Sequence, residues 1–396
     1  MEDACEFIID AEHKTAPFQK EGYPNIRTPN IGKGRLILDG VFRVSEETYR
    51  RWTKRAIPQP NDLILAREAP VGNVAIIPED ELVCLGQRTV LLRPDTQKAN
   101  PHFLCYFLLS DKMQNLMLGK SGGSTVAHLN MKDIRALELG ELPPLPTQRK
   151  IAAILSAYDD LIENNLKRIR LLEEAAQHLY REWFVRFRFP GWGGVRVVDG
   201  LPEGWEKCSF FDVAEIMSGG TPKTDRKEFW DGDIPFFTPK DGSGNNSIYI
   251  NQTERRVTEE GLKNCNSRLY PKDTIFITAR GTVGRICLAA VPMAMSQSSF
   301  ALSGKDGIGP FFLCSALQNS VEHFRKFAVG GVFDTIIIDT FKKIECFKPT
   351  KELIAYFEKI ATPMFSQIET LHFQNQKLKV ARDLLLPRLM NQTIEV

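Results

Sequence analysis

Two long stretches of the chain repeat apolar residues at alternating spacings of four and three, which is the pattern of a coiled-coil seam. They predict helices within residues 146–190, after the proline-rich boundary LPPLPT, and within residues 349–396. The first seam runs through Ile151, Leu155, Tyr158, Ile162, Asn165, Ile169, Leu172, Ala176, Leu179 and Trp183. The second runs through Ile354, Phe357, Ala361, Met364, Ile368, Leu371, Asn375, Leu378, Arg382, Leu385 and Leu389. One asparagine in each seam, Asn165 and Asn375, is predicted to fix the register of the paired helices.

The segments outside these helices repeat each other at a spacing of about 210 residues. The segment PNDLILAREAPVG (60–72) returns as PKDTIFITARGTVG (271–284), and PHFLCYFLL and NMKDI return as GPFFLCSAL and TFKKI. Short β-branched runs between Gly-, Asn- and Pro-rich loops predict an α/β fold for both copies. We therefore predict two α/β domains, residues 1–145 and 191–348, related by tandem duplication and each followed by a long helix.

Two copies in one chain are expected to be related by a pseudo-two-fold axis, which would pair the helices as an antiparallel coiled coil. A helix of about 33 residues forms a rod of roughly 50 Å, the length of about 15 base pairs of DNA. Such a rod would separate the two domains by a fixed distance. The alternative, in which both helices only cover a sheet, fits such long 3.5-residue periodicity less well.

Composition narrows the class of protein. The 396 residues suffice for two or three domains, and the 51 basic and 49 acidic residues give a net charge of +2. This balance excludes a protein that binds nucleic acid simply by being basic throughout. Residues 1–145 and residues 191–345 each contain 18 basic and 19 acidic residues, which is a further sign of duplication.

Motifs for catalysis are missing from the sequence. Gly119-Lys120-Ser121 resembles the end of a phosphate-binding loop, but Gln114 stands where the first glycine is needed. No Asn/Asp-Pro-Pro-Tyr/Phe motif for amino methylation occurs, and the six histidines are too scattered to predict a metal site. The eight cysteines form no Cys-x-x-Cys pair and are expected to be reduced core residues. Without a signal peptide or an apolar span, we expect a cytoplasmic protein with no membrane partner.

Residues 145–184 and the segment ARDLLLPRL (381–389) resemble the conserved regions of type I restriction-modification specificity subunits. Residues 201–241 resemble the opening of a target recognition domain of that family. The resemblance implies that each globular half reads one half of a bipartite site in double-stranded DNA, and that the helices set the spacer and dock modification subunits, two in number. It also implies that no cofactor binds this chain, because S-adenosylmethionine, ATP and Mg²⁺ are used by the modification and restriction subunits.

Candidate DNA-binding residues lie in polar, glycine-rich loops and after the duplicated strand, where basic and amide side chains could reach phosphates or base edges. They are Arg27, Asn30, Lys33, Arg35, Arg67, Lys120, Ser124 and Thr125 in the first half, and Lys240, Asn245, Asn246 and Arg280 in the second. Arg67 and Arg280 occupy matching places after the duplicated strand, which favours an equivalent role. The alternative for both is a salt bridge to Asp62 or Asp273 in the same motif. Two other classes of function stay open: a non-catalytic coiled-coil scaffold that binds proteins, and a solitary nuclease or methyltransferase.

Overall fold

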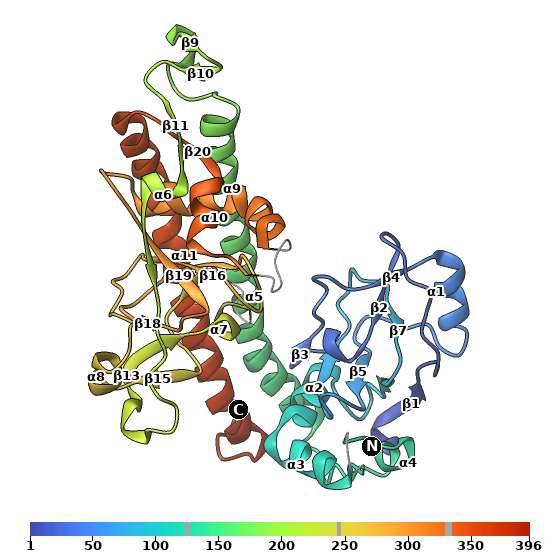
Figure 1. The fold of residues 1–396 in the computed structure, drawn as a ribbon. Helices are drawn as coiled ribbons and strands as arrows, with labels where there is room; N and C mark the ends of the chain where they lie inside the picture. The colour runs from blue at the N-terminus through green and yellow to red at the C-terminus, as the bar shows by residue number, and fades with distance from the viewer. Residues whose placement is uncertain (123–126, 244–246, 329–334) are drawn as a thin grey trace. The chain divides into compact units, whose positions relative to one another are not determined.

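The computed structural model describes residues 1–122, 127–243, 247–328 and 335–396 (Figure 1). The chain divides into two compact units, one of residues 1–161 with 377–396 and one of residues 162–376. Each unit contains one globular half and a part of both long helices.

The globular half of the first unit is built on two sheets. The larger has the order β1 (Cys5–Asp10), β8 (Thr89–Pro94), β5 (Leu63–Ala66), β6 (Val74–Ile76) and β3 (Gly34–Arg35). The smaller has the order β4 (Arg43–Val44), β2 (Tyr23–Ile26) and β7 (Cys84–Leu85). All neighbours are antiparallel except the pairs β3–β6 and β2–β7. The helical elements are η1 (Glu2–Ala4), η2 (Thr28–Asn30), α1 (Glu46–Trp52), α2 (Pro101–Leu109), α3 (Asp111–Lys120) and α4 (Met131–Arg135).

The second unit repeats this topology strand for strand. Its larger sheet has the order β12 (Ala214–Ser218), β19 (Ser299–Gly304), β16 (Ile275–Thr278), β17 (Ile286–Ala289) and β14 (Tyr249–Ile250). Its smaller sheet has the order β15 (Arg255–Val257), β13 (Trp230–Phe237) and β18 (Ala294–Met295). The two parallel pairs again are the edge pair β14–β17 and the pair β13–β18. The helices are α6 (Phe210–Val213), α7 (Pro239–Ser243), α8 (Glu259–Lys263), α9 (Pro310–Ala328) and α10 (Ile338–Lys343).

Short strand pairs complete the second unit. Strand β11 (Glu206–Ser209) pairs with β20 (Glu345–Lys348), so the beginning and the end of this globular half are hydrogen-bonded to each other. Strands β9 (Val197–Val198) and β10 (Leu201–Pro202) form a small hairpin before it.

Backbone hydrogen bonds give the register of the duplication. The bonds from Ala66 N to Asn73 O and from Gly72 N to Ala66 O return in the second unit as Thr278 N to Arg285 O and Gly284 N to Thr278 O. Gly72 and Gly284 also share a positive φ, of 88° and 79°, at which a side chain would be strained. The two sheets are therefore the same structure built twice, with Ala66 of β5 equivalent to Thr278 of β16.

Both faces of the central strand β5 are buried, which explains its uninterrupted apolar sequence. Leu63 and Leu65 belong to the core under helix α2, whereas Ile64 and Ala66 belong to the core between the two sheets. Alternation of side chains along a strand produces this division. In the second unit Ile275 likewise contacts the core under α9.

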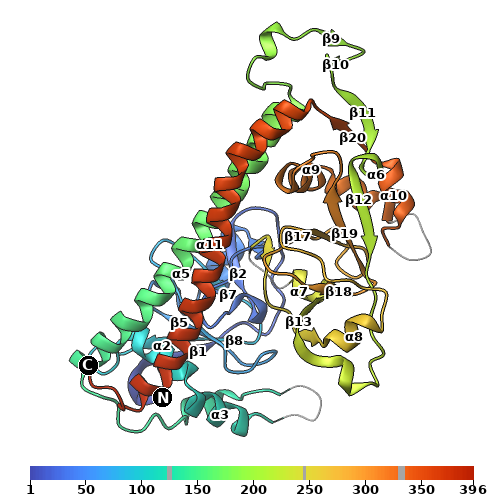
Figure 2. The same ribbon diagram turned by 90° about the vertical axis from the view of Figure 1, so that its left-hand side faces the viewer.

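The two long helices are α5 (Leu145–Tyr180), extended by a π-helical turn, η3 (Arg181–Val185), and α11 (Lys351–Met390). In the first unit Arg382 of α11 contacts Asp159 of α5, and in the second unit Asn375 contacts Asn165. From Asp159 to Asn165 the residue number on α5 rises, while that of the contacting residue on α11 falls from 382 to 375. The helices are therefore antiparallel, as predicted. Figure 2 shows them side by side.

The buried stripe of α5 departs from the predicted seam at two positions. Asp159 is 4% exposed where Tyr158 was expected, and Tyr180 is buried where Leu179 was expected. A straight helix has 3.6 residues per turn, so its buried face drifts relative to a strict 3.5-residue repeat. The drift brings a carboxylate into the helix interface, where Arg382 neutralises it.

All eight cysteines are free thiols, and six of them are buried. Burial raises the pKa of Cys84 to about 11, which keeps this thiol protonated and unreactive at neutral pH. Within the described residues, no helix is long and apolar enough to cross a membrane.

Candidate nucleic-acid interface

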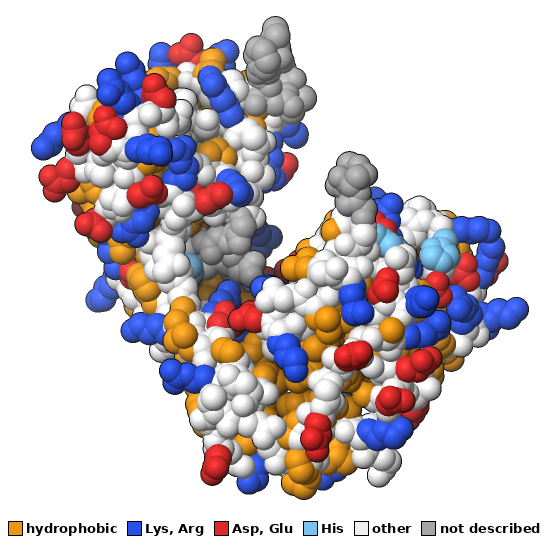
Figure 3. Space-filling view, turned by 90° about the horizontal axis from the view of Figure 1, so that it is seen from below, with side chains coloured by type: hydrophobic (Ala, Val, Ile, Leu, Met, Phe, Trp, Pro, Cys, Tyr) orange, Lys and Arg blue, Asp and Glu red, His pale blue; other side chains and the backbone are white. Residues whose placement is uncertain are grey.

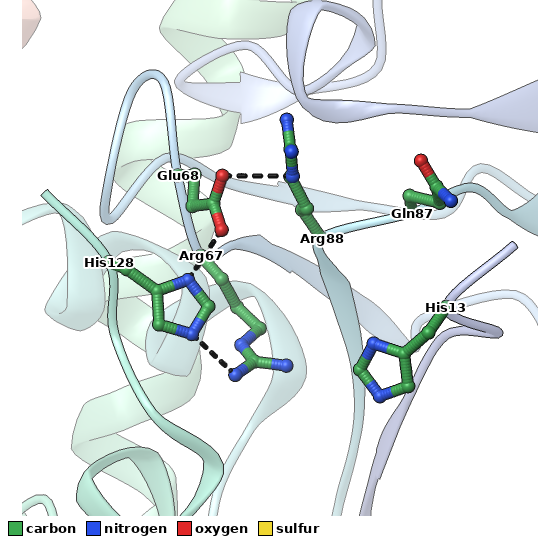
Figure 4. A pocket seen from close by; sticks show the side chains of 6 residues that line it. All are labelled: His13, Arg67, Glu68, Gln87, Arg88 and His128. Atoms are coloured by element: carbon green, nitrogen blue, oxygen red, sulfur yellow. Dashed lines mark hydrogen bonds and ion pairs between the residues drawn. The ribbon is translucent and has the colours of Figure 1, made fainter. Parts of the chain in front are cut away.

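A polar network lies at the end of strand β5 in the first unit (Figure 4). Arg67, the residue after the strand, is 7% exposed and donates from Nε to the carbonyl oxygen of Leu129 at 2.8 Å. Its Nη2 lies 2.8 Å from Nε2 of His128, and Nδ1 of His128 lies 2.6 Å from Oε1 of Glu68. An arginine can only donate, so Nε2 of His128 accepts and Nδ1 carries the proton that is shared with Glu68.

The network extends to the loop between β7 and β8. Oε2 of Glu68 pairs with Nε of Arg88 at 2.9 Å. Together with His13 and Gln87, these residues line an open cavity of about 370 Å³. Figure 4 shows Arg88 pointing away from the ring of His128, with its terminal nitrogens beyond the Glu68 contact. The cavity is therefore lined by cationic hydrogen-bond donors. Its carboxylate, that of Glu68, already has a partner on each oxygen.

Arg67 and Arg280 do not occupy equivalent places, contrary to the prediction. The register that pairs Ala66 with Thr278 aligns Arg67 with Ala279, and both backbone amides bond to the loop before the next strand, at Arg88 O and Ser298 O. Arg280 is therefore the counterpart of Glu68. The environments also differ, because Arg280 is exposed whereas Arg67 is buried.

The alternative prediction, a salt bridge within the duplicated motif, is also not what the structure shows. Asp62 receives two bonds from Arg93, of 2.8 and 2.7 Å, and makes none with Arg67 among the described contacts. Asp273 accepts from the hydroxyl of Tyr249 at 3.2 Å, and burial raises the pKa of its carboxyl.

The loop around η2 divides its four candidate residues between structural and exposed positions. Asn30 is 7% exposed, and its side chain accepts from the amide of Arg27 and donates to the carbonyl of Ile37, so it holds the loop together. Arg35 binds Asp160 on helix α5 at 3.0 Å. Lys33 is exposed, and Arg27 is half-buried with its guanidinium 4.2 Å from the ring of Phe42.

The remaining loop candidates lie in both units. Lys120 is exposed at the end of α3. Lys240 is exposed and pairs with Glu254, and the hydrogen bond to that carboxylate raises the pKa of Lys240. Ser124, Thr125, Asn245 and Asn246 lie outside the described residues. On the face drawn in Figure 3, basic and acidic side chains are interspersed, in keeping with the near-neutral charge of each half.

The two asparagines of the seams bond to each other in the second unit. Nδ2 of Asn165 donates to Oδ1 of Asn375 at 2.9 Å, and Nδ2 of Asn375 donates to the carbonyl of Ile162 at 3.3 Å. Asn165 is 2% exposed and Asn375 is 4% exposed. A buried pair of amides joined by a hydrogen bond suits the predicted function as a register determinant, because a slip would break that bond.

Sequence reasoning missed Glu68, Arg88 and His128 as members of one cluster. Glu68 and His128 are 60 residues apart in the sequence, and no local motif marks them. The one local hint was the position of Arg88 in the segment Gly-Gln-Arg-Thr (86–89), because a basic residue in a loop just before a predicted strand can contact DNA. A group of three potential metal ligands is not found among the described residues.

Two copies of one α/β module, each continued by a helix of an antiparallel pair, define a tandemly duplicated α/β protein. A model of the type I restriction modification DNA specificity domain matches residues 5–174 and again residues 202–376. The chain therefore belongs to this family and carries its domain twice, which confirms the predicted tandem architecture and specificity-subunit class.

Individual relatives agree with this assignment over nearly their whole length. The chain is 25% identical to the type I restriction enzyme HindI specificity subunit of Haemophilus influenzae, covering 95% of this chain and 96% of that protein. It is also 25% identical to a putative type I restriction enzyme MjaX specificity subunit of Methanocaldococcus jannaschii, covering 100% and 93%. The crystal structure of a type I restriction-modification S subunit from M. genitalium shares the fold, with a TM-score of 0.55, 17% identity, and coverage of 96% and 93%.

Proposed function

We propose that each globular half reads one half of a bipartite DNA site and that the paired helices set the spacer between the halves. One observation carries this proposal: the two halves share the same hydrogen-bonded framework along β5–β6 and β16–β17 but differ in the side chains that follow the central strand. A common framework with different side chains in its loops suits two domains that bind the same polymer and read different bases. The net charge of each globular half is close to zero, so the isolated chain is expected to bind DNA weakly. In the complex, the partner subunits would supply further contacts to the DNA phosphates.

The proposal includes docking of two modification subunits on the helices. Ile154 and Leu161 on α5, and Val380 and Leu384 on α11, are between 36 and 63% exposed around the Asp159–Arg382 contact in the first unit. Ile154 and Leu161 are seven residues apart and Val380 and Leu384 are four apart, so each pair lies on one face of its helix, where exposed apolar side chains favour a protein partner. In this proposal the modification subunits bind S-adenosylmethionine, the restriction subunits use ATP and Mg²⁺, and this chain binds no cofactor, catalyses no reaction and acts in the cytoplasm.

An exchange of residues 1–140 with the matching segment of another specificity subunit tests the division of labour. The exchanged chain is assembled with its modification subunits, and the methylated motif is read from genomic DNA. We expect one half of the motif to change and the other half to stay. A motif that changes in both halves, or in neither, would contradict the proposal.

Insertion of seven residues into both helices at opposed positions tests the spacer. A heptad preserves the seam and lengthens the rod by about 10 Å, which is about three base pairs. We expect a longer spacer or loss of methylation. An unchanged spacer would exclude the helices as its determinant.

A further inference from the structure

The side chain of Arg88 is held at one end and open at the other. Its Nε pairs with Glu68 at 2.9 Å, while the side chain as a whole is 63% exposed. Among the residues that the structure describes, no acceptor is bonded to its two terminal nitrogens. A guanidinium held through Nε presents these two nitrogens as a planar pair of donors, the arrangement that matches O6 and N7 of guanine.

The backbone at Arg88 is strained. Its φ is 65°, in the left-handed region that residues other than glycine rarely adopt. The carbonyl of Arg88 accepts a hydrogen bond from the amide of Arg67 at 2.9 Å, which ties the turn to the central strand. Strain of this kind concentrates at functional sites, where the surrounding structure enforces a conformation that the chain would otherwise avoid.

A chain of partly buried contacts supports the carboxylate that holds Arg88. Glu68 is only 16% exposed, and its second oxygen is bound by His128, which in turn contacts Arg67. Arg67 is anchored to the carbonyl of Leu129. The guanidinium of Arg88 is thus oriented before any ligand binds, which reduces the entropy lost on recognition.

The second unit keeps the framework of this site and replaces its side chains. Arg67, Glu68 and Arg88 correspond to Ala279, Arg280 and Ser298, because the amides of Arg67 and Ala279 make the same backbone bonds. His128 corresponds to Thr335, since the next residue in each copy, Leu129 or Ile336, donates to that strand end. Phosphate contacts carry no sequence information and are needed in both halves, whereas base contacts must differ between halves that read different sequences.

We propose that Arg88 is a specificity-determining residue of the first half, which reads a guanine in its half-site, and that Glu68, His128 and Arg67 are its positioning residues. This inference rests on the proposed function. It goes further by naming Arg88 as the residue that reads a base and guanine as the base that it reads. Arg280 and Ser298 occupy the corresponding places in the second half and are expected to read a different base.

The test uses the complex with modification subunits and a set of duplexes with each base in turn at every position of the motif. With Arg88→Gln, we expect discrimination at one guanine of the first half-site to fall by about 5- to 150-fold, with every other position unchanged. Arg88→Lys keeps the charge but loses the paired donors, so it should relax the same position. Glu68→Gln should relax that position to a smaller extent.

A matched control is Arg50→Gln, which removes an exposed arginine of the same half that pairs with Glu46 on α1. It should leave the motif unchanged. If Arg88→Gln slows methylation of all duplexes equally, or Arg88→Lys restores full discrimination, Arg88 contacts a phosphate and the inference is wrong. If the Arg88 variants leave the motif intact while the exchange of residues 1–140 changes one half-site, the inference fails and the proposed function stands.

Discussion

Replacement of the buried Asn165–Asn375 pair by leucine should show strong non-additivity. Asn375→Leu alone removes the acceptor that lies 2.9 Å from Nδ2 of Asn165, a residue 2% exposed. An unpaired buried polar group lowers the free energy of unfolding by about 1–3 kcal/mol. The converse variant, Asn165→Leu, leaves Oδ1 of Asn375 without its donor. The double variant leaves no orphaned amide and adds two apolar side chains to the helix interface. It should therefore be at least as stable as the natural chain.

The measurement is a double-mutant cycle on urea denaturation, followed through the helical circular dichroism signal. The two single variants should each lower the free energy of unfolding by about 1–3 kcal/mol, with a coupling energy of at least about 2 kcal/mol in the double variant. A double variant as destabilised as the sum of the two singles would refute the reasoning, because it would show that the amides act independently. Because the leucine pair no longer penalises a slipped register, the double variant should also broaden the distribution of spacer lengths in methylated sites.

Three further predictions concern the helices. Arg382→Met leaves the buried carboxylate of Asp159 without its cation and should destabilise the first unit by about 3–5 kcal/mol; thermal unfolding that matches the natural chain would contradict this. Burial raises the pKa of Glu358 from 4.5 to about 6, so the folded chain binds this proton more tightly; stability from this group is present below pH 4.5 and is lost as pH rises through 6. Glu358→Gln should remove about 2 kcal/mol of pH dependence between pH 4.5 and 7, and identical pH profiles of variant and natural chain would exclude it. Leu384→Glu should abolish co-purification with modification subunits, whereas Val198→Glu, an exposed apolar control on β9, should not; retention by both would exclude this docking surface.

The repeat and the two seams were readable from sequence because each depends on local pattern. A seven-residue apolar periodicity specifies a helix pair wherever it occurs, and a polar residue within it is visible as an exception. Asn165 and Asn375 could therefore be singled out without coordinates, and the structure shows them bonded to each other. The α/β class followed in the same way from apolar runs that are too short for helices and bounded by turn residues.

Alignment of the two copies by sequence alone was wrong by one residue at the central strand. Similar letters placed Arg67 opposite Arg280, but strand register depends on backbone hydrogen bonds, which pair Arg67 with Ala279. A shift of one residue moves a side chain to the other face of a strand, so it changes which residues can be equivalent. Sequence alone also did not separate Asn30 from Lys33, which lie in one loop. Asn30 is buried and hydrogen-bonded within the loop, whereas Lys33 is exposed.

The sequence by itself determined the duplicated architecture, the helix pair and the family. Tertiary structure decided which polar side chains form a site, because Glu68, Arg88 and His128 come from three segments that meet only after the sheet has folded. It also decided that Asp159, and not Tyr158, faces Arg382, because the helix keeps 3.6 residues per turn while the sequence repeats every 3.5. Local periodicity specifies elements, whereas the meeting of distant side chains depends on the register and packing of those elements.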